Sequence, residues 1–204
     1  VTVSYLRSEL AHAGNEVRYQ RAAMDDVPAP LVDVRIRADN EADAPWYGRT
    51  MGEIQVRGPF ITGSYHEAPA TEDKFTQDGW LRTGDVATID ALGFVRITDR
   101  TKDLIKSGGE WISSVDLENA LMAHPSIAEA AVISIPDEKW GEAPHAFIVF
   151  RAGCEAPPAE LRAFCREHLA HFKVPRYVRF VEEYPQTVTG KIQKFKLRDM
   201  TKTA

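Results

Sequence analysis

Apolar and polar residues alternate along two short segments near the start of the chain. The segments 31–37 (Leu-Val-Asp-Val-Arg-Ile-Arg) and 52–58 (Gly-Glu-Ile-Gln-Val-Arg-Gly) place apolar side chains at every second position. A period of two is typical of a strand with one buried face. The segments 86–89 and 93–98 flank a short Asp-Ala-Leu-Gly connection, which predicts a hairpin. We therefore expect an antiparallel β-rich part in the first hundred residues.

The second half of the chain combines helical and strand patterns. Ser113-Ser114 can cap a helix that begins near Val115, and a second helical spacing starts at Pro158 and runs to Phe172. Apolar strands are predicted at 127–135, 146–150 and 177–181, and residues 196–204 are interpreted as a frayed basic end. Such a mixture predicts a small α+β domain. We place the domain boundary between residues 101 and 102. The predicted fold class is α+β, with an antiparallel β-rich part followed by a small α+β domain.

The segment 99–110 joins these two parts. It has the sequence Asp-Arg-Thr-Lys-Asp-Leu-Ile-Lys-Ser-Gly-Gly-Glu, with four charges in its first five residues and paired glycines near its end. Two interpretations stand: a solvated loop with a glycine turn, or a junction that moves or touches a charged ligand.

Composition excludes several classes of protein. The chain has 204 residues, 44% hydrophobic and 27% charged, with a formal net charge of −5. This charge argues against broad binding to nucleic acid or anionic membranes. No apolar run reaches membrane-spanning length, and two cysteines favour a reducing cytoplasm over a disulfide framework. Because Val1 is not an initiator Met, we expect a fragment of a longer protein.

Two segments carry candidate chemistry. Asp85 ends the sequence Trp-Leu-Arg-Thr-Gly-Asp, and a carboxylate after a glycine turn can accept both hydroxyls of a ribose. The alternative is a turn in which Asp85 caps backbone amides. Lys191 ends the sequence Pro-Gln-Thr-Val-Thr-Gly-Lys, and a lysine there suits a phosphate or carboxylate oxygen. The alternative is an ordinary exposed lysine, and the pattern is not a Walker-type phosphate loop.

Cys165, His168 and His171 imitate the spacing of metal ligands. On a helix, Cys165 and His168 would share the apolar face, whereas His171 would be rotated toward the flank. No second cluster of ligands accompanies them, so we expect no metal site.

Taken together, the motifs resemble the C-terminal portion of the adenylate-forming acyl-CoA synthetases. This family includes fatty-acyl-CoA ligases, firefly luciferase and carrier-loading adenylation domains. Three ordered motifs carry the resemblance: Thr-Gly-Asp ending at Asp85, Asp-Arg-Thr-Lys-Asp at 99–103 continuing to Gly109 and Glu118, and Pro-x-Thr-x-x-Gly-Lys ending at Lys191.

The resemblance implies a reaction in two steps. ATP and a carboxylic acid form an acyl-adenylate and pyrophosphate, and the CoA thiol then displaces AMP. It implies that Asp85 and Arg100 contact the nucleotide and that Lys102 is the hinge of a small mobile domain.

The resemblance also divides the remaining residues between the two steps. Lys191 would act in adenylation, with Lys106 and Gly109 in thioester formation. Trp111 would line the pantetheine route or pack beneath the glycine turn.

The large-domain motifs of this family are absent from the sequence. We expect 1–101 to be the end of the large domain, 102–204 the small domain, and the ATP phosphate loop, the acyl pocket and most Mg²⁺ contacts to lie elsewhere. The isolated chain is therefore expected to be inactive. The predicted substrate is a fatty or medium-chain acid. The alternatives are an adenylation domain that loads a carrier protein and a non-catalytic binding module of the same fold.

Overall fold

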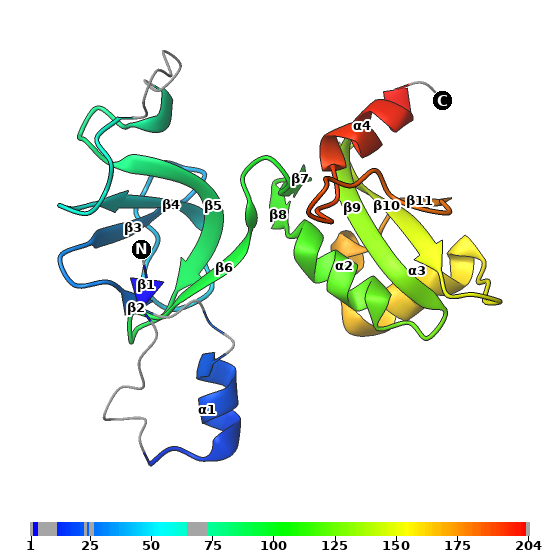
Figure 1. Cartoon of the computed structure of the whole chain (residues 1–204), viewed down its shortest axis with the longest axis horizontal. Coiled ribbons are helices and arrows are strands. Elements are labelled where there is room, and N and C mark those ends of the chain that lie inside the picture. Colours follow the sequence, from blue (N-terminus) through cyan, green and yellow to red (C-terminus); the bar gives the residue numbers. More distant parts are fainter. Residues whose placement is uncertain (1, 4–11, 23, 25–26, 65–72, 203–204) are drawn as a thin grey trace. The chain divides into compact units, whose positions relative to one another are not determined.

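A computed structural model describes residues 2–3, 12–22, 24, 27–64 and 73–202 (Figure 1). The chain divides into two compact units, Val1–Lys102 and Asp103–Ala204. Both contain helices and mainly antiparallel sheet, so the predicted α+β class is confirmed. Among the described residues, no helix is both long and apolar enough to cross a membrane.

The first unit is built on a four-stranded antiparallel sheet. Its strands are β3 (Asp33–Arg37), β4 (Gly52–Arg57), β5 (Leu81–Ile89) and β6 (Val95–Arg100), in the order β3-β4-β5-β6. A two-stranded sheet of β1 (Thr2–Val3) and β2 (Val27–Pro28) and the helix α1 (Asn15–Ala22) complete this unit. The alternating patterns thus form the strands that they predict, with Ile36 and Val56 almost completely buried.

The Thr-Gly-Asp sequence lies inside a strand, and the prediction of a turn there is wrong. β5 begins at Leu81 and continues through Asp85 to Ile89. Gly84 has a φ of +75°. The pairing register of β5 shifts both against β4 and against β6. An irregular strand can therefore absorb a glycine that the sequence pattern assigns to a turn. Arg100 likewise belongs to β6 rather than to the following loop.

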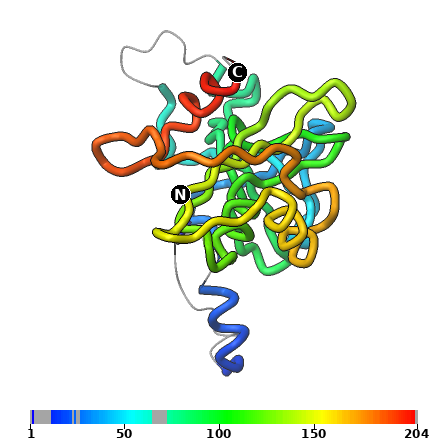
Figure 2. Tube along the Cα trace, turned by 90° about the vertical axis from the view of Figure 1, so that its right-hand side faces the viewer, coloured from blue at the N-terminus to red at the C-terminus, as the bar shows by residue number. Residues whose placement is uncertain are grey.

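The second unit contains a five-stranded sheet. The strands are β7 (Ile105–Ser107), β8 (Glu110–Ile112), β9 (Ile127–Asp137), β10 (Gly141–Phe150) and β11 (Tyr177–Phe180). β10 pairs antiparallel with β9, parallel with β11 and, at Gly141 alone, antiparallel with β7. The helices are α2 (Ser114–Met122), α3 (Pro158–His168) and α4 (Lys194–Lys202), with a short 3₁₀ helix at His171–Lys173 (Figures 1 and 2).

Both faces of the β9–β10 pair are covered. Val132 and Ile148 pack in one apolar cluster with residues of α2 and α3, whereas Ile133 and Phe147 pack in another with Leu197 of α4. A strand buried on both faces is apolar at successive positions, which explains the four successive apolar residues at 130–133.

For two elements of this unit, the predicted end of the element is wrong. Residues 196–202, expected to fray, belong to α4, because Leu197 is completely buried against the sheet. The helix that begins at Pro158 ends at His168, and Phe172 is 47% exposed beyond it.

The segment 99–110 is also more ordered than an open loop. Its last part forms the β7–β8 hairpin, in which Lys106 pairs with Trp111 and Ser107 with Glu110. Gly108 and Gly109 make the turn, with φ values of +60° and +86°. The paired glycines thus supply the left-handed backbone that such a tight hairpin requires.

Candidate active site

Asp85 and Arg100 are brought together by the pairing of β5 with β6. The two residues are register partners, and Arg100 Nε lies 3.4 Å from Asp85 Oδ1. The Asp85 amide donates to Thr83 Oγ1 at 3.1 Å, and Thr83 Oγ1 donates to the Ile54 carbonyl at 2.9 Å. The Asp85 side chain is 32% exposed. The strand fixes the backbone of Asp85, while its carboxylate stays partly exposed and can accept hydrogen bonds from a diol.

A cavity of about 220 Å³ lies beside Asp85. Its other walls are mostly apolar and come from all four strands of the sheet and from β1; they are Thr2, Val34, Ile54, Thr83, Val95 and Ile97. The carboxylate is therefore the only charged group among the described residues that line it.

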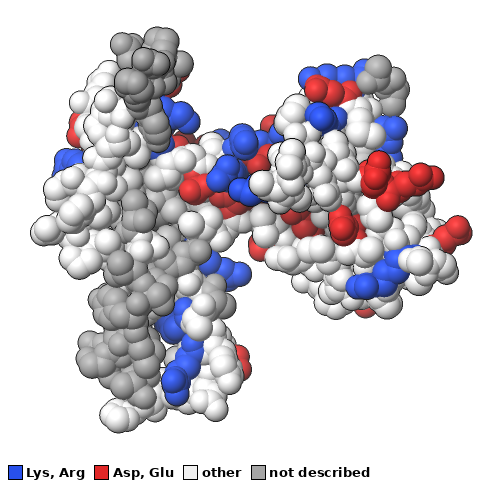
Figure 3. Space-filling view, in the orientation of Figure 1, with Lys and Arg blue, Asp and Glu red and all other residues white. Residues whose placement is uncertain are grey.

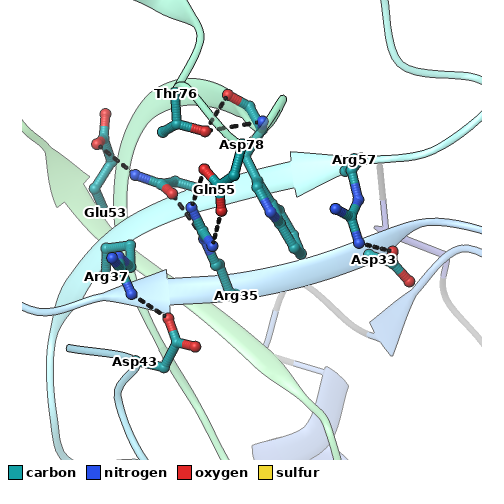
Figure 4. A network of polar contacts seen from close by, with 10 residues as sticks. Asp33, Arg35, Arg37, Asp43, Glu53, Gln55, Arg57, Thr76 and Asp78 are labelled. Atoms are coloured by element: carbon teal, nitrogen blue, oxygen red, sulfur yellow. Dashed lines mark hydrogen bonds and ion pairs between the residues drawn. The ribbon is translucent and has the colours of Figure 1, made fainter. Parts of the chain in front are cut away.

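A polar network joins β3 and β4 to the segment just before β5 (Figure 4). The guanidinium of Arg35 bonds both carboxylate oxygens of Asp78, at 2.8 and 3.1 Å. This contact, together with the Thr76 hydroxyl, holds the pKa of Asp78 well below its usual range. Arg35 and Arg57 also lie over the Trp80 ring, at 4.4 and 4.6 Å from its centroid. Trp80, the residue just before β5, is thus held between side chains of β3 and β4.

The β7–β8 hairpin carries three other predicted site residues. Lys106 Nζ lies 4.9 Å from the centroid of the Trp111 ring, and the Lys106 amide donates to Glu142 Oε2 at 2.7 Å. Gly109 has open space where a side chain would begin. At Gly108 a Cβ atom would lie 2.9 Å from the Trp140 ring. The turn is therefore packed against Trp140 on one side and open at Gly109.

Lys191 lies on a second tight hairpin, which we call the Lys191 hairpin and define as residues 185–193. Thr187 donates its amide to the Lys191 carbonyl at 2.8 Å, and the Lys191 amide donates to Thr187 Oγ1 at 3.1 Å. Gly190 makes the turn with a φ of +79°. The Lys191 side chain is exposed, so its ammonium is available to an anionic ligand.

Lys102 is the last residue of the first unit and is exposed between β6 and β7. The predicted residues thus form three groups: Asp85 with Arg100, Lys106 with Trp111 and Gly109, and Lys191 on its own hairpin.

The sequence reasoning missed a pocket of about 460 Å³ in the second unit. We call it the arginine pocket; its main polar and aromatic lining residues are Trp140, Arg162, Arg166, His171, Phe172 and Arg176. Within the described part of the chain, Arg162 and Arg166 form no ion pair, whereas Arg176 pairs with Asp137 at 2.9 Å. The spacing of Arg162 and Arg166, four residues apart on one helix, is a signal that could have indicated it.

The residues of the apparent metal motif have other roles. Cys165 is completely buried, and this burial raises the pKa of its thiol. His168 is exposed rather than on the apolar face, with Nδ1 2.8 Å from the Phe164 carbonyl, and His171 lines the arginine pocket. In the parts of the chain that are described, no group of three His, Cys, Asp or Glu side chains could hold a metal ion.

Charge on the surface of the second unit is local. The face seen in Figure 3 carries small groups of basic and acidic side chains, some of them adjoining one another, within a largely uncharged surface.

Comparison with known proteins identifies relatives of this chain. Residues 116–191 match the family described as the AMP-binding enzyme C-terminal domain. The chain is 45% identical over 208 residues to a long-chain-fatty-acid–CoA ligase of Thermus thermophilus, a match that covers 99% of the chain and 38% of that protein. It is 43% identical over 174 residues to a peroxisomal trans-cinnamate:CoA ligase of Petunia hybrida, with 85% of the chain and 30% of that protein covered.

A solved structure gives the same result. An o-succinylbenzoate CoA synthetase from Bacillus subtilis, in complex with its acyl-adenylate intermediate, has a TM-score of 0.77 and 33% identity. The match covers 93% of the chain and 37% of that protein. The chain therefore corresponds to the C-terminal portion of the adenylate-forming acyl-CoA synthetases, and it spans less than two fifths of the length of these relatives.

Proposed function

We propose that this chain acts as part of an AMP-forming acid–CoA ligase. The observation that carries the proposal is the match along 99% of the chain to a CoA ligase, with each predicted motif inside the matched range. The reaction joins a carboxylic acid to the α-phosphate of ATP, with loss of pyrophosphate. The CoA sulfur then attacks the acyl carbon, and AMP leaves with the electron pair of the broken bond.

In this proposal Asp85 accepts hydrogen bonds from the ribose hydroxyls of the adenylate. The ion pair of Asp85 with Arg100, and the hydrogen bond from the Asp85 amide to the Thr83 hydroxyl, support this role. They hold Asp85 in place before the nucleotide arrives. The small cavity beside Asp85 would take the apolar edge of the nucleoside.

Lys191 is proposed as the cation of the adenylation step. An exposed ammonium on a hydrogen-bonded hairpin can approach the carboxylate and the α-phosphate, where negative charge develops. Lys106, Gly109 and Trp111 are proposed for the thioester step, with the open space at Gly109 accommodating the pantetheine arm. Residues 1–101 would then be the end of the large domain and 102–204 the small domain, with Lys102 as the hinge between them.

The arginine pocket is proposed as the site of the nucleotide end of CoA. Arg162 and Arg166 offer two cations to its phosphates, and the half-exposed rings of Trp140 and Phe172 offer stacking surfaces to its adenine. Glu110 also lines the pocket and would repel a phosphate, so we assign the phosphates to the arginine side.

The acid is proposed to be a fatty or medium-chain acid, which places the enzyme in lipid metabolism. The Thermus relative carries the name of a long-chain ligase, whereas the Petunia relative is named for trans-cinnamate. The test therefore needs a panel of acids.

The full-length protein encoded by the gene would be incubated with MgATP, CoA and one of butyrate, decanoate, hexadecanoate, benzoate or trans-cinnamate. We expect a CoA thioester, identified by its mass, together with equal amounts of AMP and pyrophosphate. Absence of thioester with every acid, or formation of ADP, would contradict the proposal. The 204-residue chain alone should give no ATP–pyrophosphate exchange.

The arginine pocket has its own test. Arg162→Ala and Arg166→Ala should each raise the KM for CoA at least fivefold and leave the KM for ATP within twofold. Arg151→Ala is the matched control, because Arg151 is exposed in the same unit but does not line the pocket. An unchanged KM for CoA in both pocket variants would exclude this site.

A further inference from the structure

The Lys191 hairpin is attached to the sheet of the second unit at its first end. Tyr184, just before the hairpin, is 6% exposed, and its hydroxyl lies 2.7 Å from the Phe147 carbonyl and 3.1 Å from the Glu129 carbonyl. Burial, with the carboxylates of Glu129 and Glu118, raises the pKa of this phenol, which therefore keeps its proton and donates. The first end of the hairpin is thus fixed to β9 and β10.

The second end is held by a charged contact. Lys194 begins α4, three residues after Lys191, and its Nζ lies 2.7 Å from Glu118 Oε1 and 2.8 Å from Ser114 Oγ. Glu118 Oε1 also accepts the Val132 amide at 2.8 Å. The side chains of Lys194 and Glu118 are only 17% and 15% exposed, so water screens this ion pair weakly.

Between these two ends Ile192 packs against the apolar cluster that contains Tyr184 and Leu197, and the rest of the hairpin is held by its own contacts. The amide of Gln193 donates to the Pro185 carbonyl, and the isolated bridge between Gln186 and Ile192 closes the two legs. Val188 at the tip is fully exposed. The direction in which the hairpin projects is therefore set at its base, by Tyr184 on one leg and by Ile192 and Lys194 on the other.

The β7–β8 hairpin does not share this dependence. Ile105 and Ile112 are completely buried in the core, and the Gly108 amide donates to the Trp140 carbonyl at 2.9 Å. The Lys106 amide is bonded to Glu142. Loss of the Lys194 contact should therefore leave the residues assigned to the thioester step in place.

We propose that Lys194, through its ion pair with Glu118 and its hydrogen bond to Ser114, is a positioning residue for Lys191 and hence for adenylation alone. This rests on the proposed function of Lys191. The ammonium reaches across from α4 to α2 and orients the leg that carries Lys191, without touching the substrate itself. An arginine can make the same contacts, whereas a methionine of similar length cannot.

The test uses the full-length enzyme and separates the two half-reactions. Adenylation is followed by ATP–pyrophosphate exchange with the acid that the unmodified enzyme uses best in the panel above. Thioester formation is followed from the synthetic adenylate of that acid and CoA. The variants are Lys194→Met, Lys194→Arg, Glu118→Gln and Lys191→Ala, with Lys196→Met as the control because Lys196 is exposed on the same helix.

We expect Lys194→Met to slow exchange at least tenfold and Glu118→Gln at least threefold. Thioester formation should stay within twofold in both. Lys194→Arg should restore exchange to within threefold of the unmodified enzyme, and Lys196→Met should change neither step by more than twofold. In a Lys191→Ala background, Lys194→Met should slow exchange no further, because its effect acts through Lys191.

Equal losses in both half-reactions, or an additional loss in the Lys191→Ala background, would overturn the assignment. If Lys194→Met does not fold, Glu118→Gln is subject to the same comparison, since it keeps the shape of the side chain and can still accept from Val132. An unmodified enzyme that performs neither half-reaction would instead refute the proposed function, which the panel of acids detects separately.

Discussion

Replacement of Gly108 by alanine tests how the β7–β8 turn is packed. At a φ of +60° any residue with a Cβ is disfavoured, by about 1–2 kcal/mol. The new Cβ would also lie 2.9 Å from Trp140 Cε3, so that the ring must move. Overpacking of this kind costs about 1–3 kcal/mol, and we take about 1 kcal/mol because Trp140 is 44% exposed and can shift. The expected loss of stability is therefore about 2–3 kcal/mol.

Gly109→Ala is the matched control. Its φ of +86° has the same backbone penalty, but no atom lies within 4 Å of the new Cβ. It should therefore destabilise the unit by only about 1–2 kcal/mol. In a Trp140→Ala background the two alanine variants should become equal, which isolates the contact with the ring in a double-mutant cycle.

Native-state hydrogen exchange suits this measurement. Amides in the middle of β9 and β10 exchange through unfolding of the second unit, so they report its stability independently of the first unit. Equal effects of Gly108→Ala and Gly109→Ala with Trp140 present would refute the packing argument. Because Trp140 and Gly108 also line the arginine pocket, Gly108→Ala should raise the KM for CoA in the full-length enzyme.

Two further predictions concern stability. Burial, with the charge of Arg179, lowers the pKa of His145 below that of an unfolded histidine. The contribution of His145 to stability should therefore be constant above about pH 6.5 and fall below it, by at most about 1.4 kcal/mol per pH unit. Hydrogen exchange at pH 7.5 and 5.5 should show this fall, and His145→Phe should reduce it. Leu117→Ala should lower the unfolding free energy by about 2–5 kcal/mol because Leu117 is completely buried, whereas Val115→Ala, at 41% exposure, should change it by less than about 0.5 kcal/mol in urea unfolding.

Periodic burial made much of the fold predictable. The segments 31–37 and 52–58 alternate because their apolar side chains pack in one cluster on one face of the sheet, and residues 130–133 are all apolar because both faces of β9 are covered. The end of the chain was misjudged because α4 is anchored mainly by Leu197 and a few neighbours, and a short helix with a narrow apolar contact gives a weak periodic signal.

The site was predictable only where its motifs are contiguous. Asp85 and Lys191 stand in short recognisable sequences, whereas the arginine pocket joins Trp140, Arg162 and Phe172 from separate elements. The contact of Lys194 with Glu118 spans 76 positions, and only the packing of α4 near α2 reveals it. Single-sequence patterns do not carry such long-range pairing.

The division of labour between Lys191 and Lys106 is the central claim, and it can be measured directly. In the full-length enzyme, ATP–pyrophosphate exchange and thioester formation from a supplied adenylate would be compared in Lys191→Ala and Lys106→Ala. We expect Lys191→Ala to lose at least a hundredfold in exchange and less than threefold in thioester formation, with the reverse pattern for Lys106→Ala. Equal loss of both half-reactions in both variants would contradict the account.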